Sequence, residues 1–146
     1  MQTKIKHVLE EKGSEIISIQ KNALIDEVVK VMNENHIGAV VVKEGETVVG
    51  IVSERDLLKK LLAEHKDPLA TTAGDIMTDQ LVITTTDKTC EECINVMTSH
   101  RVRHLPVYEG KDLVGIISIG DLMKRLAKDR DAKVHYLQDY IAGSYT

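Results

Sequence analysis

The chain has 146 residues and a formal net charge of −4, from 19 basic and 23 acidic side chains. This length indicates one domain, or two very small ones that share a core. Because the chain has no Phe and no Trp, its core must be aliphatic, and a base-stacking surface for single-stranded nucleic acid is not expected. The chain has neither a Lys/Arg-rich run nor an apolar run as long as a membrane helix, which argues against nucleic-acid and membrane partners. Two cysteines and a charged N-terminus without a signal-peptide pattern predict a cytoplasmic location.

The first predicted element is a helix over Thr3–Lys12, which ends at Gly13. Beyond it, the chain matches itself without a gap after a shift of 65 residues, so that Val48–Leu61 lies over Leu113–Leu126. Two copies at this period do not form a solenoid, which needs three or more short repeats. The self-match therefore predicts a pair of equivalent, pseudosymmetric units.

Each copy predicts the same order of elements, β-α-β-β-α. A short apolar run predicts the first strand of each copy, at Ile16–Ile19 and at Leu81–Thr84. Helical spacing follows, with N-caps predicted at Asn22 and Asp87. Two further apolar runs form a hairpin around a Glu-Gly turn. These hairpin strands are predicted at Ala39–Val42, Val48–Val52, Leu105–Val107 and Leu113–Ile117.

A second helix starts at Ser53 in copy one and at Ser118 in copy two, where it continues as a C-terminal flanking helix over 129–141. Near-continuous apolar strands indicate sheets that are covered on both faces. We therefore predict an α+β fold in which the two repeats pack with pseudo-two-fold symmetry through their sheets, with flanking helices at both ends. The predicted divisions are residues 1–64, a polar linker at 65–74 with Pro68 and Gly74 as breakers, and residues 75–146.

The motif Gly-h-h-Ser-x-x-Asp, where h is apolar, follows the hairpin in both copies, at Gly50–Asp56 and Gly115–Asp121. With His100–Gly110 and the preceding Ile76–Thr78, it resembles the CBS domain, the regulatory repeat of cystathionine β-synthase, over residues 13–126. The chain is similar to stand-alone bacterial proteins made of one CBS pair, or Bateman module. The resemblance implies a non-enzymatic sensor that binds AMP, ADP, ATP or a related adenine nucleotide in clefts between the repeats. It also implies a disk-like homodimer that signals through the dimer or through an effector protein.

The acidic residue of each motif is the predicted ribose contact. Ser followed three positions later by an acidic residue also forms a capping box without any ligand, and that alternative is open for either motif taken alone. The two copies in the CBS register favour a ligand site, because a carboxylate can accept hydrogen bonds from both vicinal ribose hydroxyls. By resemblance, Asp56 and Asp121 bind ribose in the two clefts, with Ser53 and Ser118 beside them.

By resemblance, aliphatic side chains enclose the purine, although plain core packing is the alternative for each of them. The base-slot candidates are Ile17, Ile37, Ile51, Met77, Val82, Val102 and Ile116. For the phosphates, copy two supplies positive charge where copy one leaves room. The phosphate candidates are Arg103, His104, Arg101, Gly38 and Arg55. Strand alternation predicts Arg101 and Arg103 on one face, where a solvated edge or salt bridges are the alternative to phosphate binding.

No catalysis and no metal are predicted. Cys90 and Cys93 overlay the apolar Ile25 and Val28, and zinc needs four ligands, so we expect small core residues there. No nucleophile has a base at a recognisable spacing. Three alternatives stay open: NAD binding in one cleft, a nucleotide-independent dimerisation or partner-binding module, and a nucleotide hydrolase, for which His104 is the only candidate base.

Overall fold

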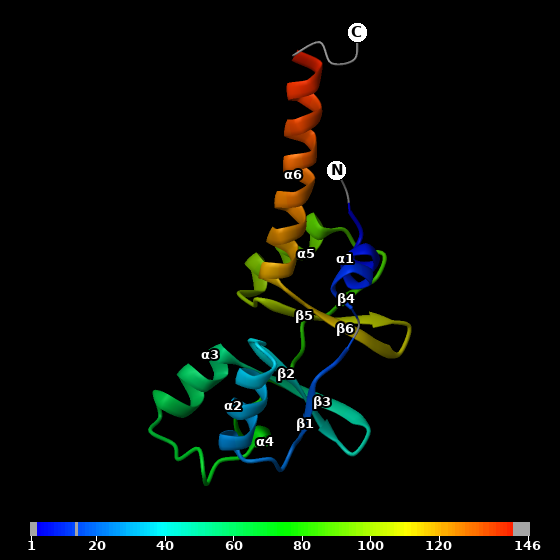
Figure 1. Cartoon of the computed structure of the whole chain (residues 1–146). Helices are drawn as coiled ribbons and strands as arrows, with labels where there is room; N and C mark the ends of the chain where they lie inside the picture. Colours follow the sequence, from blue (N-terminus) through cyan, green and yellow to red (C-terminus); the bar gives the residue numbers. More distant parts are fainter. Residues whose placement is uncertain (1–2, 14, 142–146) are drawn as a thin grey trace. The chain divides into compact units, whose positions relative to one another are not determined.

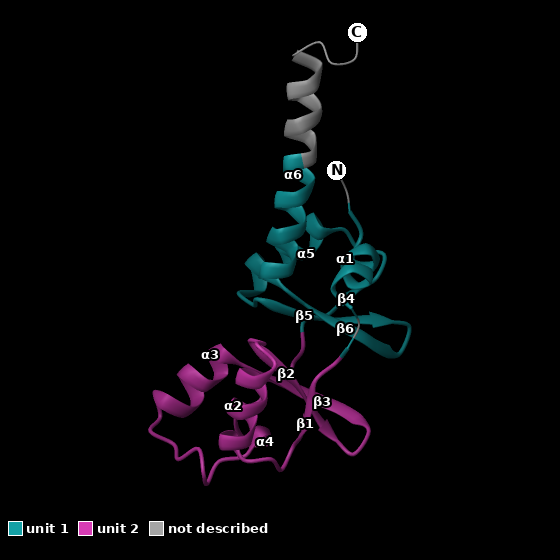
Figure 2. Cartoon of the chain, in the orientation of Figure 1, with its two compact units in different colours: residues 1–15, 82–146 teal, residues 16–81 magenta. Residues whose placement is uncertain are grey.

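The computed structural model describes residues 3–13 and 15–141, with side chains up to Asp131. The chain forms two compact units (Figure 2): unit 2 comprises residues 16–81 and contains the first repeat, and unit 1 comprises residues 1–15 and 82–146 and contains the second. Each unit holds a three-stranded sheet, with strand orders β1-β2-β3 and β4-β5-β6 (Figure 1). The predicted α+β class with two equivalent repeats is confirmed.

The sheet of unit 2 is mixed, because β1 runs parallel to β2 while β2 pairs antiparallel with β3. Its strands are β1 (Ser18–Gln20), β2 (Ala39–Glu44) and β3 (Thr47–Ser53). Its helical segments are α2 (Ile25–Glu34), α3 (Glu54–Asp56), the π-helical η1 (Leu57–Leu62) and α4 (Ala73–Ile76).

Unit 1 repeats this arrangement, with β4 parallel to β5 and β5 antiparallel to β6. Its strands are β4 (Thr84–Thr85), β5 (His104–Glu109) and β6 (Asp112–Ser118). Its helices are α1 (Ile5–Lys12), α5 (Cys90–His100) and α6 (Ile119–Ile141). Both hairpins carry a register shift at the same point of the repeat, after Val42 and after Val107. The predicted hairpins and the continuous C-terminal helix are confirmed.

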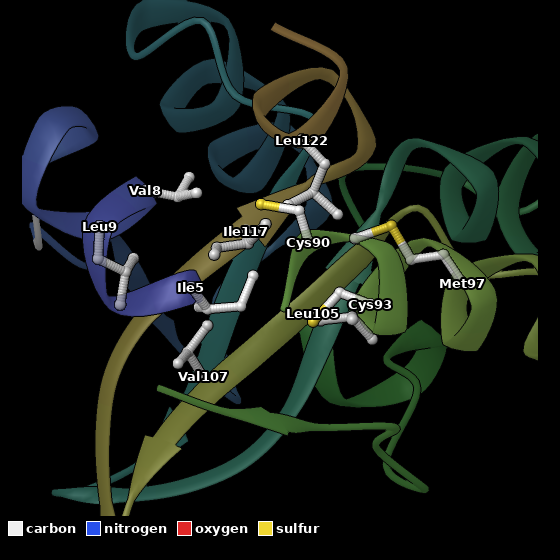
Figure 3. Packing of buried hydrophobic residues seen from close by; sticks show 10 residues of the cluster. All are labelled: Ile5, Val8, Leu9, Cys90, Cys93, Met97, Leu105, Val107, Ile117 and Leu122. Atoms are coloured by element: carbon white, nitrogen blue, oxygen red, sulfur yellow. The ribbon is translucent and has the colours of Figure 1, made fainter. Parts of the chain in front are cut away.

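Aliphatic side chains and small sulfur residues fill the core of unit 1, as Figure 3 shows. Its buried members are Ile5, Val8, Leu9, Cys90, Cys93, Met97, Leu105, Val107, Ile117 and Leu122. Three of them come from α1, so this helix is part of the core rather than an appendage. In unit 2, β2 is buried over Ala39–Val42, which confirms that both faces of this strand are shielded from solvent.

The two units exchange their leading helices. Helix α1 precedes the first repeat in the chain but packs in unit 1, while α4 precedes the second repeat but packs in unit 2. Isolated bridges Lys4–Thr89 and Leu24–Thr72 mark the equivalent contacts, since residues 24 and 89 differ by the repeat offset. The predicted divisions were defined by the sequence repeat, whereas the compact units are defined by packing. The two are different divisions of the chain, and the predicted one stays a prediction.

The predicted helix starts and first strands need correction. Helix α2 has Leu24 as its N-cap and α5 has Thr89, rather than Asn22 and Asp87. Thr89 forms a capping box with Glu92, while the Asp87 carboxylate instead accepts a hydrogen bond from the Thr85 hydroxyl. Strands β1 and β4 are shorter than predicted and begin two and three residues later, at residues 18 and 84.

Gly74 is not a breaker, because it lies inside α4. A Cβ atom at this position would lie 2.6 Å from the Cγ of Lys21. The glycine therefore allows α4 to lie close to the turn after β1, which a larger residue would push away.

Candidate functional site

Both Ser-x-x-Asp motifs cap the helix that follows them. In unit 2, the Ser53 amide donates to Asp56 Oδ2 at 2.9 Å and the Asp56 amide donates to Ser53 Oγ at 3.3 Å. In unit 1, the Ser118 amide donates to Asp121 Oδ2 at 2.9 Å and the Asp121 amide donates to Ser118 Oγ at 3.1 Å. Reciprocal bonds of this kind satisfy amides that the first helical turn leaves unpaired, so both motifs have a structural role without a ligand.

The carboxylate of Asp56 is enclosed, with its side chain only 9% exposed. The Thr78 hydroxyl donates to its Oδ1 at 2.9 Å, and Lys60 Nζ lies 3.0 Å from the same oxygen. Lys60 also donates to the Ile76 carbonyl at 3.2 Å. Both oxygens of Asp56 are thus engaged by side chains and backbone of its own unit.

The segment that carries Thr78 lies against β3 at the glycine of the motif. Thr78 and Ile51 exchange backbone hydrogen bonds of 2.8 and 3.0 Å. A Cβ atom on Gly50 would lie 2.8 Å from the Thr78 carbonyl oxygen and 2.7 Å from Met77 Sδ. At the equivalent Gly115, a Cβ atom would lie 2.6 Å from a methyl carbon of Leu9. In both units, therefore, glycine makes room for the exchanged segment.

Asp121 is more open, with 24% of its side chain exposed. Lys12 Nζ donates to its Oδ2 at 2.7 Å and to the Ile116 carbonyl at 2.7 Å. Burial alone would raise the pKa of Asp121, but the hydrogen bonds from Lys12 and from the Ser118 amide outweigh burial and hold the pKa below its ordinary value. The carboxylate is therefore ionised at neutral pH.

Arg103 and Gly38 occupy equivalent places beside these helix starts. The Arg103 carbonyl accepts the Ile119 amide at 2.8 Å, and the Gly38 carbonyl accepts the Glu54 amide at 3.0 Å. The Arg103 side chain is exposed. The residue before the second strand, whose carbonyl bonds the helix start, is thus an arginine in unit 1 and a glycine in unit 2.

The prediction that Arg101 and Arg103 share a strand face is wrong. Arg101 is the C-cap of α5 in the left-handed conformation, with φ 55°, and β5 begins only at His104. The equivalent His36 has φ 53°, so the helix end of both repeats requires this backbone geometry. His104 is half-buried at the start of β5, and Arg55 is exposed within α3.

The base-slot candidates divide between the units. Ile51 is buried, and the other six are half-buried. Five of these six pack against a core: three on that of unit 2, namely Ile17, Ile37 and Met77, and two on that of unit 1, namely Val82 and Val102. These five side chains combine core contact with partial exposure, which fits both core packing and a contact with a bound purine.

Three residues at the carboxylates were not among the predicted site residues: Lys12, Lys60 and Thr78. The shift of 65 residues places Lys60 opposite Arg125, so the sequence already shows that the two units differ at this position. Arg125 points elsewhere, with Nη1 3.0 Å from Glu11 and Nε 3.3 Å from Asp129. Asp121 therefore pairs with a lysine from α1, while Asp56 pairs with a lysine from η1, which directly follows α3.

Metal-binding groups, the two cysteines and membrane-spanning helices were the remaining features to check. Among the residues the structure describes, no group of three or more His, Cys, Asp or Glu side chains is arranged to hold a metal ion. Cys90 and Cys93 are buried free thiols, and burial raises the pKa of both, which confirms them as core residues. Every helix in the described part of the chain is too short or too polar to cross a bilayer.

Comparison with known proteins identifies the repeats. The family model for the CBS domain matches residues 6–63 and 73–128. A mitochondrial CBS domain-containing protein of Arabidopsis thaliana is 36% identical over 122 residues, which are 80% of this chain and 59% of the relative. The chain thus spans less than two thirds of that relative's length.

Solved structures agree with the sequence matches. A protein with CBS domains from Burkholderia ambifaria is 37% identical with a TM-score of 0.84, over 87% of this chain and 96% of the other. A hexameric CBS-CP12 protein from bloom-forming cyanobacteria is 27% identical with a TM-score of 0.74, over 84% of this chain and 67% of the other. The similarity extends over both repeats.

Proposed function

Because the chain belongs to the CBS domain family, whose tandem pairs are generally regulatory, non-catalytic modules, we propose that it is a non-enzymatic sensor of adenine nucleotides such as AMP, ADP and ATP. The observation that carries the proposal is the start of α6. There, an ionised and partly exposed carboxylate, Asp121, lies at a helix N-terminus close to the backbone of Arg103.

The start of α6 offers what a nucleoside phosphate needs. The Oδ1 atom of Asp121 makes no hydrogen bond within the described part of the chain and can accept one from a ribose hydroxyl. Helix N-terminal amides favour an anion, and the guanidinium of Arg103 suits a phosphate in bidentate geometry. Asp121 and Ser118 accordingly bind ribose, and Arg103 binds phosphate, with His104 and Arg101 as further candidates.

Asp56 and Ser53 form the second, weaker site. Its ribose contact requires Thr78 or Lys60 to release the Asp56 carboxylate, and Gly38 supplies no cation, so that Arg55 is the phosphate candidate. The base-slot candidates of unit 2 are Ile17, Ile37, Ile51 and Met77, and those of unit 1 are Val82, Val102 and Ile116. The nucleotide therefore binds first at unit 1.

The output passes through a second copy of the chain or through an effector protein. The similarity to a hexameric CBS-CP12 protein supports association between copies. A nucleotide that binds one arrangement of the assembly more tightly shifts the population toward it.

A second candidate function is a partner-binding module that does not depend on nucleotide. The observation that favours it is the enclosed Asp56, whose oxygens are already satisfied by Ser53, Thr78 and Lys60. If unit 1 also takes no ligand, the motifs serve only as helix caps.

Calorimetric titration and thermal melts with AMP, ADP, ATP, NAD and, as a pyrimidine control, UMP distinguish these functions. We expect adenine nucleotides to bind and to raise the melting temperature, because a ligand at one hundred times its Kd stabilises the native state by about 2.7 kcal/mol. Preference for NAD over the mononucleotides would select the dinucleotide alternative. Absence of binding and of stabilisation by every nucleotide would refute the proposal and favour the second candidate.

A further inference from the structure

The last residue of α1 binds the carboxylate to which we assign the ribose. Lys12 Nζ lies 2.7 Å from Asp121 Oδ2 and 2.7 Å from the Ile116 carbonyl oxygen. The two contacts hold the ammonium between the end of β6 and the start of α6. Neither contact belongs to the repeat itself, because Lys12 lies 109 residues from Asp121 in the chain.

Asp121 Oδ2 already accepts two hydrogen bonds and cannot accept a third from a ligand. A carboxylate oxygen offers about two acceptor positions, and this oxygen already accepts the Ser118 amide at 2.9 Å and Lys12 at 2.7 Å. A ribose diol that bonds both oxygens must replace one of them. The Ser118 amide is fixed by the helix cap, so Lys12 is the group that leaves.

The matching place in unit 2 does not carry this charge. There, the exchanged segment presents Met77 and the hydroxyl of Thr78, and the cation comes from Lys60 on the helix that Asp56 caps. A lysine from the exchanged helix is therefore a feature of unit 1 alone among the two described sites.

Lys12 is also one end of a row of contacts between the N-terminal segment, residues 3–12, and α6. Glu11 lies 3.0 Å from Arg125 and 2.6 Å from Lys128, and the Thr3 hydroxyl donates to Asp129 at 2.9 Å. The hydrogen bonds from Lys128 and Arg125 hold the pKa of Glu11 below its ordinary value. A change at Lys12 thus reaches the contacts that fasten α1 along α6.

We propose that Lys12 is a latch on the nucleotide site: it occupies Asp121 in the unliganded protein, the ribose displaces it, and its release loosens the end of α1 from α6. The proposal rests on the proposed nucleotide binding at Asp121. It assigns to α1 a role in coupling the site to the rest of unit 1.

Titration of AMP into four proteins tests the latch. Lys12→Met keeps the apolar stem and removes the charge, while Lys12→Arg keeps the charge. Lys6→Met is the matched control, since Lys6 is exposed on the same helix and its loss changes the net charge equally. We expect K12M to bind AMP roughly three- to tenfold more tightly than the wild type. K6M should match the wild type, and K12R should bind no more tightly than it.

The salt dependence of AMP binding by the wild type and K12M provides a second measurement. Screening weakens a partly exposed ion pair, so the affinity gap between wild type and K12M should narrow as NaCl rises. Binding by K12M that equals or falls below the wild type would overturn the latch while leaving nucleotide binding intact. If none of the four proteins binds AMP, ADP, ATP or NAD in the same titration, the proposed function fails and the latch fails with it.

Discussion

Units 1 and 2 cap the helix after the hairpin in the same way, but they differ in which residues cover the carboxylate of the cap. Both use a reciprocal Ser–Asp cap. In unit 2, the Asp56 side chain is 9% exposed, whereas in unit 1 the Asp121 side chain is 24% exposed. The duplicated motif determines the cap, and the segments packed around it determine whether a ligand can reach the carboxylate.

The exchanged helices show the same contrast. Helix α1 has eight residues and contributes three buried side chains, while α4 has four residues and contributes two, Ala73 and Ile76. Unit 1 is thus completed by a longer helix that brings its own cation, Lys12, to the site. Comparisons of equivalent positions in the two units can therefore separate what the repeat dictates from what the exchanged segment adds.

The largest expected effect comes from core leucines at equivalent positions. Leu122 is completely buried, whereas Leu57 is half-buried. Leu122→Ala should lower the free energy of unfolding by about 2–5 kcal/mol, because it removes apolar contacts and leaves a cavity, and Leu57→Ala should cost less. Urea denaturation measures both, and an equal loss for the two variants would contradict the difference in packing.

The two motif glycines give the next effect. An added Cβ at Gly50 meets a backbone oxygen, whereas at Gly115 it meets only the end of the Leu9 side chain. Gly50→Ala should therefore destabilise by about 1–3 kcal/mol, as overpacking does, and Gly115→Ala by less, since a side chain yields more easily than backbone. Thermal unfolding of the two variants measures both losses of stability. A greater loss of stability in G115A than in G50A would contradict this prediction.

Removing the two carboxylates should lower the stability of the protein by different amounts. Asp56→Ala breaks a cap and leaves Lys60 and Thr78 without their partner, so it should cost about 1–3 kcal/mol of stability. Asp121→Ala should cost about 1 kcal/mol, chiefly from the cap. Denaturation curves for both variants provide the check, and a larger loss for D121A would show that exposure does not govern the cost.

The smallest effect is the pH dependence of the Lys12–Asp121 pair. The folded-state pKa of Asp121 lies below the ordinary value of 3.8, so its stabilisation is present above that value and is lost as pH falls through the folded-state pKa. For a partly exposed pair this amounts to about 1 kcal/mol or less. The difference in unfolding free energy between wild type and K12M should be measurable at pH 7 and should shrink as the pH falls below 3.8 and through the folded-state pKa. A difference that does not change with pH would exclude the ion pair as its source.

The repeat accounts for what could be predicted from the sequence. A shift of 65 residues aligns both hairpins, both Ser–Asp caps and the apolar positions of Cys90 and Cys93, because each depends on residues close together in the chain. The cap at Thr89 was missed because Asp87 has an equally suitable side chain, and only its bond with Thr85 removes it from the role.

The exchange of α1 and α4 and the contact of Lys12 with Asp121 could not be predicted in the same way. Both depend on packing between segments far apart in the chain, and an internal repeat contains no information on which copy a flanking helix joins. The left-handed Arg101 was also missed, since strand alternation was applied to a residue that ends a helix.

Calorimetric titration of AMP into D121A and D56A, beside the wild type, tests most directly whether the start of α6 is the nucleotide site. We predict that D121A weakens the tightest binding event at least tenfold, while D56A, provided that its melt shows it folded, retains that event. Undiminished AMP binding by D121A would contradict the account.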